Sequence, residues 1–599
     1  MNQRQFIKGS TSGVEAFHWL LIRLFAALAA NVVTLLEVGF YDPIITPGWT
    51  HFFQALFLCL IWIVLILAYL TRKNRRVWIR SRVRELVLLS LATLSVLGRA
   101  EVTTLLLVLL LILYFVRVYV VLAHMVVRPG LMFLSSFILM IVAGAILLRL
   151  PRATPPGDPI STLDSFFTAT SSVCVTGLIV RDTATEFTRF GQVIILTLIQ
   201  LGGLGIVIFG ALFATMLGGS LSLRHAASVQ EVVRSAEGGI ADIDRLVRFV
   251  VVATLLTEAV GALLLYPAWP QDLAAGERVF LSVFVSISSF CNAGFAPFTN
   301  SLVNYRYEWA PHLVVAPLIV LGGLGFPALF NLWQVFYSKV QVKIGRKRRR
   351  RGYEDRIVRI NLHTKIVIST TLALYLFGVV AIMGGQLSPY LHEFLRLTDP
   401  DAVRTLPTLD GPQVWRHTLD ASFMSITART AGFNTLPMEE LTPSSQFVLM
   451  LLMWVGGSPG STAGGVKTVA IAVLLITIWA TVRGRRETEA FGRSIPDELV
   501  RRAGVLVMLG FFTVAATTYA LTITEAPALA EKIFESVSAV STVGLTLDYT
   551  DDLTPAGRLI IIFAMFLGRV GPLVMLGTLA FGASGRARYR YPAESVVMG

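Results

Sequence analysis

Charged residues are scarce in this chain of 599 residues: they make up 15% of the sequence, against 55% for apolar residues. Soluble proteins carry about a quarter charged residues, which excludes an ordinary water-soluble composition. The mean hydropathy is +0.70. Because about 20 apolar residues suffice for a helix to cross the hydrocarbon core of a bilayer, the composition indicates an all-α polytopic membrane protein.

Residues with reactive side chains are also rare. The three cysteines lie in apolar stretches and predict no disulfide framework: Cys59, Cys174 and Cys291. Cys174 and Cys291 have no histidine or further cysteine at ligand spacing, which favours packing over a metal site. The histidines His18, His363 and His417 are scattered without partners at useful spacing. We therefore expect no enzyme and no organic cofactor.

The net charge of +14 is concentrated in short hydrophilic breaks between apolar segments. These breaks lie at 72–84, 343–351, 483–486 and 586–590. Short loops rich in Lys and Arg mark the cytoplasmic side of a membrane protein, so contact with lipid is expected and a nucleic-acid partner is not. No cleavable signal precedes the first apolar segment, which is expected to remain as a helix.

Twelve spans are predicted, and a cytoplasmic N-terminus then puts every basic break on one side and both termini in the cytoplasm. The spans are 17–39, 51–71, 85–98, 101–124, 130–150, 191–217, 246–268, 312–339, 363–385, 445–482, 502–523 and 555–582. The first four form an accessory or oligomerisation bundle at 1–125. Their arginines lie mainly in a loop rather than at every third position of a span, which argues against a voltage sensor.

An internal repeat dominates the rest of the chain. Four polar segments at 161–180, 278–297, 418–435 and 532–547 are too long for turns and too polar to cross. Such backbone is tolerated at membrane depth only where it is buried in protein or lines a cavity. A second glycine-rich stretch follows each segment. The pattern predicts four helix–pore-loop–helix repeats around one pore, at 126–235, 236–345, 346–495 and 496–599, the last with a cytoplasmic C-terminal tail.

The loops are expected to form a potassium selectivity filter, because backbone carbonyls can replace the water shell of the ion. Glycine allows the positive φ and close approach that this needs, although helix packing is the alternative for any single glycine. The predicted filter residues are Val175, Thr176, Gly177, Asn292, Ala293, Gly294, Thr430, Ala431, Gly432, Thr542, Val543 and Gly544. Asp164, Asp420 and Glu535 are expected near the starts of the short preceding helices, as caps.

A gate is predicted where a Gly/Ser/Thr run interrupts the span 445–482, since such a run does not hold a helix; a passive kink is the alternative. Its residues are Gly456, Gly457, Ser458, Gly460, Ser461, Thr462, Gly464 and Gly465. Arg569 interrupts an apolar span, and either forms a barrier beneath the filter or pairs with an acid or with carbonyls. Lys467 either steers the loop or is solvated. The run LGGLG, at 201–205 and again at 321–325, favours helix packing over phosphate binding.

Five motifs carry a family resemblance: VTGLIVRDTATEF (175–187), IQLGGLG (199–205), RTAGFNT (429–435), GGSPGSTAGGVKT (456–468) and GRVGPL (568–573). Over about 130–583 the chain resembles the Trk/Ktr/HKT superfamily of potassium transporters, most of all the bacterial KtrB-type subunit. The resemblance implies a filter glycine in each repeat, potassium rather than sodium because Gly177 is not serine, a gating loop at 456–465 and a pore arginine at Arg569.

The resemblance also implies an assembly in the inner (plasma) membrane. Similar proteins form homodimers with one pore per subunit, on a cytosolic ring of nucleotide-binding RCK subunits of the KtrA/TrkA type. The four extra N-terminal spans depart from this pattern. Three alternatives remain: a sodium-selective or sodium-coupled carrier, a membrane-embedded enzyme and a non-conducting sensor or scaffold.

Overall fold

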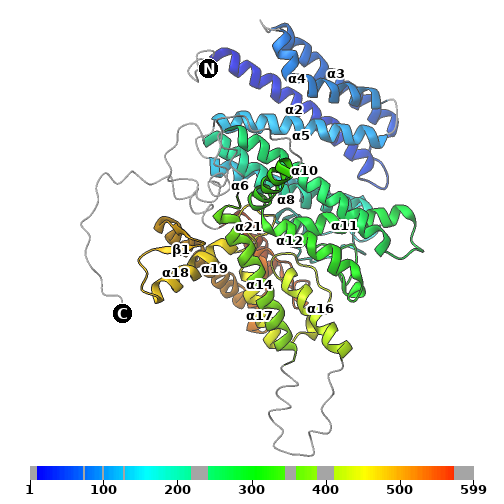
Figure 1. Ribbon diagram of the computed structural model, residues 1–599. Helices are drawn as coiled ribbons and strands as arrows, with labels where there is room; N and C mark the ends of the chain where they lie inside the picture. Colours follow the sequence, from blue (N-terminus) through cyan, green and yellow to red (C-terminus); the bar gives the residue numbers. More distant parts are fainter. Residues whose placement is uncertain are drawn as a thin grey trace, which may run out of the picture. The chain divides into compact units, whose positions relative to one another are not determined.

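The computed structural model describes residues 10–71, 75–96, 100–125, 129–217, 240–343, 359–387 and 411–571, and most of them are helical (Figure 1). The basic break at 586–590 and the C-terminal tail lie outside these residues. The chain divides into two compact units. The first holds Met1–Pro129, Val142–Ala169 and Arg181–Thr197, and the second holds Gly130–Ile141, Thr170–Val180 and Leu198–Gly599.

Four helices form the N-terminal bundle of the first unit: α2 (Ser10–Val38), α3 (Pro47–Leu70), α4 (Arg75–Ser95) and α5 (Ala100–Met125). They pack through a core in which Ala27, Leu58 and Leu107 are fully buried. α3 begins with Pro47, which suits the first helical position because the N–H group it lacks has no partner inside the helix there. The prediction of four additional N-terminal helices is confirmed.

An ionic cluster lies inside this bundle. The carboxylate of Glu85 is fully buried and accepts hydrogen bonds from Arg23 at 2.6 Å, from Arg82 at 2.9 Å and from Arg117. Arg23 is 1% exposed and also lies over the ring of Tyr114. Sequence analysis placed the arginines of this region mainly at a loop and missed the cluster, because its members come from three different helices.

A short helix precedes each predicted filter loop, as expected: α7 (Thr162–Cys174), α11 (Ala275–Cys291), α16 (Gly411–Thr427) and α20 (Leu529–Ser541). The helices around them are α6 (Pro129–Leu148), α8 (Arg189–Leu217), α10 (Ile240–Leu265), α14 (Leu362–Gln386), α19 (Asp497–Thr524) and α21 (Pro555–Val570). In the second unit α14 packs against both α16 and α17 (Pro443–Trp454), and these helices lie side by side in Figure 1.

Several of these helices can cross a bilayer. Within the described ranges, five are long and apolar enough: His18–Val38, Pro47–Leu70, Arg248–Ala268, Leu362–Gln386 and Asp497–Thr524. A sixth crossing is possible through Pro311–Leu324 and Phe326–Gln341, which are bent by 99° relative to each other. The protein is therefore a multi-pass membrane protein, while the threading of twelve spans stays a prediction.

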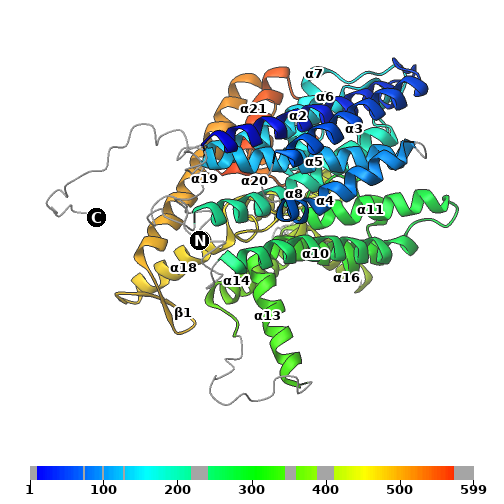
Figure 2. The same ribbon diagram turned by 90° about the horizontal axis from the view of Figure 1, so that it is seen from above.

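The continuous span expected at 312–339 is wrong. The chain forms α12 (Ala316–Leu324) and α13 (Phe326–Lys343) instead, and α13 turns away at Gly325 (Figure 2). Gly325 has φ +86°, which glycine adopts readily and which interrupts the helix. The break predicted in 445–482 is confirmed, since α17 ends at Trp454 and α18 (Thr468–Val482) begins after it.

A two-stranded hairpin between α18 and α19 was not predicted. β1 (Thr488–Ala490) pairs antiparallel with β2 (Arg493–Ile495). The two turn residues, Phe491 and Gly492, have φ +52° and +73°. Two positive φ values are what a type I′ hairpin turn needs, but the usual first residue is Asn, Asp or Gly, so the sequence signal is weak.

Candidate ion filter and gate loop

The four predicted filter glycines form a closed ring. A Cβ added to each would meet the carbonyl oxygen of the residue before the next repeat's glycine. The distances are 2.5 Å from Gly177 to Ala293, 2.9 Å from Gly294 to Ala431, 2.5 Å from Gly432 to Val543 and 2.2 Å from Gly544 to Thr176. No side chain fits in these gaps. The filter loop of each repeat thus contacts the loop of the next repeat, and the loop of the fourth repeat contacts that of the first.

The same backbone turn occurs in each loop. The residue two positions before the glycine has a positive φ: 55° for Val175, 60° for Asn292, 70° for Thr430 and 52° for Thr542. Three of these residues are β-branched, for which this conformation is rare, at a cost of order 1–3 kcal/mol each. The surrounding structure must therefore hold the loops in place. The structure brings all twelve predicted filter residues together.

Buried hydroxyl groups hold the loops in two ways. In the first and fourth repeats the glycine N–H donates to a serine hydroxyl, from Gly177 to Ser171 and from Gly544 to Ser538, each at 3.1 Å. In the second and third repeats the hydroxyl donates to the carbonyl after the glycine. These bonds join Ser288 to Phe295 at 2.7 Å and Thr427 to Phe433 at 2.6 Å. Sequence analysis missed these roles. The available signal is a hydroxyl residue six positions before the glycine in the first, second and fourth repeats, and five positions before it in the third.

The second glycine-rich stretch of a repeat allows close packing between the short helix and the following span. A Cβ on Gly202 would lie 2.0 Å from the Val173 carbonyl oxygen, and the same distance separates Gly322 from Phe290 and Gly568 from Val540. Each of these carbonyls lies four residues before a filter glycine. The packing role expected for 201–205 is confirmed. In the third repeat Gly456 instead meets Gly464 O at 2.1 Å, inside the predicted gate loop.

The gate loop, residues 455–467, is not a simple kink in a helix, because it is hydrogen-bonded to another part of the chain. Three backbone hydrogen bonds join it to the break between α12 and α13. Ser458 N donates to Gly323 O at 3.0 Å, Thr462 N donates to Gly322 O at 3.3 Å, and Phe326 N donates to Gly460 O at 3.0 Å. The Lys467 ammonium folds back on the loop and donates to Ala463 O at 2.8 Å. The unexpected break at Gly325 is thus part of the seat for this loop.

Arg569 lies at the end of α21 and is 5% exposed. Its guanidinium donates to Thr462 O in the gate loop and to Gly202 O at 3.1 Å in α8. Over the described residues we find no carboxylate paired with it, and its Nε–H has no hydrogen-bond partner. The sequence left open whether Arg569 pairs with an acid or with carbonyls. Among the described residues its partners are carbonyl oxygens, and no acid neutralises its charge.

Acidic residues anchor the surrounding loops. Asp420 accepts two hydrogen bonds from Arg306, at 2.9 and 2.8 Å, and Arg306 also contacts Glu440 at 3.1 Å. Burial is the largest single effect and lowers the pKa of Arg306, but the hydrogen bond and charge of Asp420, together with Tyr307 and Glu440, raise it above its usual value. The expected position at a helix start is wrong for Asp420 and Glu535, because α16 begins at Gly411 and α20 at Leu529.

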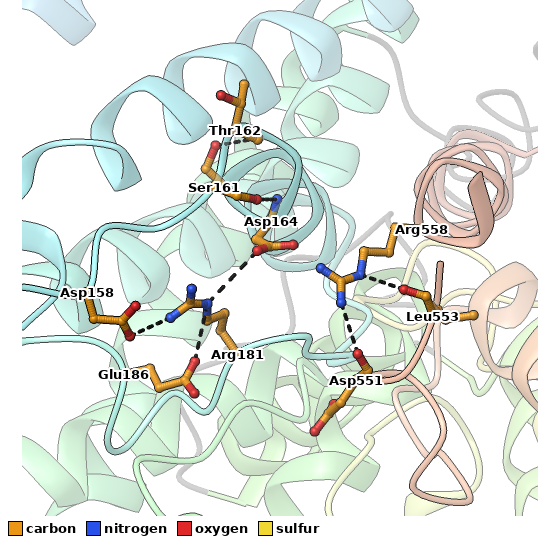
Figure 3. A network of polar contacts seen from close by, with 10 residues as sticks. Asp158, Ser161, Thr162, Asp164, Arg181, Glu186, Asp551, Leu553 and Arg558 are labelled. Carbon is orange, nitrogen blue, oxygen red and sulfur yellow. Dashed lines mark hydrogen bonds and ion pairs between the residues drawn. The ribbon is translucent and has the colours of Figure 1, made fainter. Parts of the chain in front are cut away.

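Two further arginines fix loops, each within its own unit (Figure 3). In the first unit Arg181 faces three carboxylates: Asp158 at 2.6 Å, Glu186 at 3.5 Å and Asp164 at 4.0 Å. Asp164 lies in the first turn of α7, where the sequence placed it. In the second unit Arg558 donates to the carbonyls of Leu553 at 3.0 Å and Asp551 at 2.9 Å.

Four short helices, each ending in a tight glycine loop, close into one ring between apolar spans. This arrangement defines a polytopic membrane protein of the class built from four pore-loop repeats. The family model described as "TrkH: Cation transport protein" matches residues 131–581. The chain belongs to this family of cation transporters, and the helices before residue 131 lie outside the matched region.

The chain is similar to several curated proteins along nearly their whole length. It is 34% identical to "Ktr system potassium uptake protein B" of Bacillus subtilis over 465 residues, 78% of this chain and 95% of that protein. It is 31% identical to "Potassium/sodium uptake protein NtpJ" of Enterococcus hirae, over 79% of this chain and 97% of that protein. The crystal structure of the potassium transporter TrkH from Vibrio parahaemolyticus shares the fold, with a TM-score of 0.56 at 17% identity, covering 85% of this chain and 97% of that one.

Proposed function

We propose that this protein takes up potassium across the plasma membrane through the ring formed by Gly177, Gly294, Gly432 and Gly544. The closed ring is the observation that carries the proposal, because it gathers one carbonyl-bearing loop from each repeat. Three curated relatives of high similarity are named potassium uptake proteins, two of the Ktr system and one potassium/sodium protein. The filter residues are the twelve named from the sequence.

In this mechanism a dehydrated potassium ion exchanges water for backbone carbonyl oxygens. The candidates are the carbonyls of Thr176, Ala293, Ala431 and Val543, one per repeat, which lie next to the ring glycines. The four short helices end at the ring, so the negative ends of their dipoles favour a cation there. The membrane potential supplies about 2.3 kcal/mol per charge for each 100 mV.

The gate loop and Arg569 control passage in this proposal. The loop is seated by hydrogen bonds that a modest movement of α12 and α13 would break. Arg569 contributes a positive charge that raises the barrier for cations. A separate cytosolic RCK-type regulator, a homodimer and cytoplasmic termini complete the assembly, which the name "Ktr system" of the relatives supports as a multi-component system.

Sodium is the second candidate ion, because NtpJ is named a potassium/sodium uptake protein. Sodium would be carried by the same ring or would accompany potassium. The glycine at position 177, where serine is associated with sodium in similar proteins, favours potassium as the principal ion. Replacement of external potassium by sodium separates the two functions.

Uptake of rubidium-86 into proteoliposomes tests the proposal, with Gly294→Ser as the filter variant. Its Cβ would lie 2.9 Å from Ala431 O and from the Cα of Gly432, so the ring cannot keep its shape. The matched control is Gly276→Ser in the preceding helix, where an added Cβ meets nothing within 4 Å. We expect loss of uptake or of preference over sodium in Gly294→Ser alone. Equal, selective uptake by both variants would exclude the ring as the filter.

A further inference from the structure

We propose that Thr462, although it belongs to the gate loop, determines the ion preference of the filter through Asn292. This inference rests on the proposed function, since it assigns a filter to the glycine ring. Thr462 and Asn292 are each 1% exposed, so neither side chain can exchange its partners for bulk water. The Thr462 hydroxyl lies 3.2 Å from Asn292 Oδ1 and 3.2 Å from Phe290 O.

Both backbone polar groups of Thr462 are hydrogen-bonded. Its N–H donates to Gly322 O in α12, and its carbonyl accepts a hydrogen bond from Arg569. The side chain then reaches the filter loop of the second repeat. Thr462 is therefore the point at which the gate loop, the broken helix, the buried arginine and the filter meet.

Asn292 differs from its three counterparts, Val175, Thr430 and Thr542. It has the left-handed conformation that asparagine tolerates better than β-branched residues do, and its amide packs against α12, where a Cβ on Gly322 would meet Oδ1 at 2.5 Å. Its Nδ2–H₂ group is buried and has no partner in the described part of the chain. The Thr462 hydroxyl is thus a polar partner of the Asn292 amide from outside the filter loop of the second repeat.

A hydroxyl group both donates and accepts, so Thr462 can complete a relay. With the amide turned by half a turn, Nδ2 donates to the Thr462 hydroxyl, which donates to Phe290 O. In either orientation the hydroxyl joins the gate loop to the filter loop of the second repeat. Ser461, its neighbour, bonds within the loop, to Ser458 O at 2.6 Å.

A shift of Asn292 changes the filter because it directly precedes Ala293. The Ala293 carbonyl is the one that lies against Gly177 in the ring. Small displacements of one coordinating carbonyl alter the balance between a larger and a smaller cation. The seating of the gate loop therefore sets the preference of the filter as well as the rate of passage.

The test compares Thr462→Val with Ser461→Ala in proteoliposomes, by rubidium-86 and sodium-22 uptake. Valine keeps the shape of threonine and removes the hydroxyl. We expect Thr462→Val to lower the rubidium-to-sodium uptake ratio about threefold to tenfold, the effect of one hydrogen bond. We expect Ser461→Ala to change the uptake rates without changing their ratio. Thr462→Ser keeps the hydroxyl group and should keep the wild-type ratio. An unchanged ratio in Thr462→Val would overturn the proposal, whatever happens to the rate.

Binding gives a second measurement that needs no open gate. A bound ion stabilises the native state, so the melting temperature of wild type in detergent rises with potassium more than with sodium. In Thr462→Val this difference shrinks if Thr462 sets the preference, and a difference equal to wild type contradicts it. If wild type shows neither uptake nor a potassium-dependent shift in melting temperature, the proposed function fails. If wild type shows both and Thr462→Val keeps the same ion preference, only the inference about Thr462 fails.

Discussion

Arg569 carries its charge at a buried position where the described partners are carbonyl oxygens. In the proposed mechanism this charge adds to the barrier that a passing cation meets. A barrier lowered by about 1 kcal/mol raises a rate about fivefold. We therefore expect Arg569→Gln to increase rubidium-86 uptake severalfold, since glutamine removes the charge and keeps one amide donor. Arg558→Gln, on the same helix, should leave uptake near the wild-type level.

The packing of single glycines leads to a stability prediction at the same scale. In Gly202→Ala the methyl group would lie 2.0 Å from Val173 O, so the filter helix has to move. Overpacking of this kind costs about 1–3 kcal/mol, and the melting temperature should fall. The control is Gly504→Ala in α19, where nothing lies within 4 Å. There alanine should be neutral or stabilising, and a similar fall in both variants would contradict this account.

At the scale of elements, the break between α12 and α13 and the gate loop form one unit. In Gly325→Ala the residue would need φ +86°, and its Cβ would lie 2.7 Å from Pro459 O. The loop then loses its seat, so we expect faster ion leak together with a lower melting temperature. Gly384→Ala in α14, with nothing within 4 Å, is the control. Tight, wild-type closure in Gly325→Ala would show that the seat does not restrain the gate.

The sequence predicts the elements that local patterns specify. The four filter helices, the glycine of each loop and the broken span near 455–467 follow from hydropathy and an internal repeat, and the structure contains them. It does not predict the bond between Arg306 and Asp420 or the cluster at Glu85, because each joins residues far apart in the chain. The break at Gly325 was missed since an LGGLG run inside an apolar stretch also fits an unbroken helix.

On the scale of the whole molecule, the N-terminal bundle can be tested separately from the pore. Removing one partner of a buried ion pair costs about 3–5 kcal/mol, and Glu85 is the shared partner of three arginines. We expect Glu85→Ala to lower the melting temperature while each folded molecule keeps its rubidium uptake. Arg485→Ala, which removes an exposed pair, should change neither quantity. Loss of uptake at unchanged stability would assign the bundle a part in conduction.

The ring of four glycines is contributed by a single polypeptide. In a channel made of four identical subunits, any substitution appears four times around the axis, and every wall changes together. Here each quarter can vary alone, and the chain uses this freedom: one quarter has the docked loop, one has the bent helix that receives it, and one has the arginine that joins the loop to α8 of the first repeat. Covalent linkage of the repeats thus permits an asymmetric closure that strict fourfold symmetry would forbid.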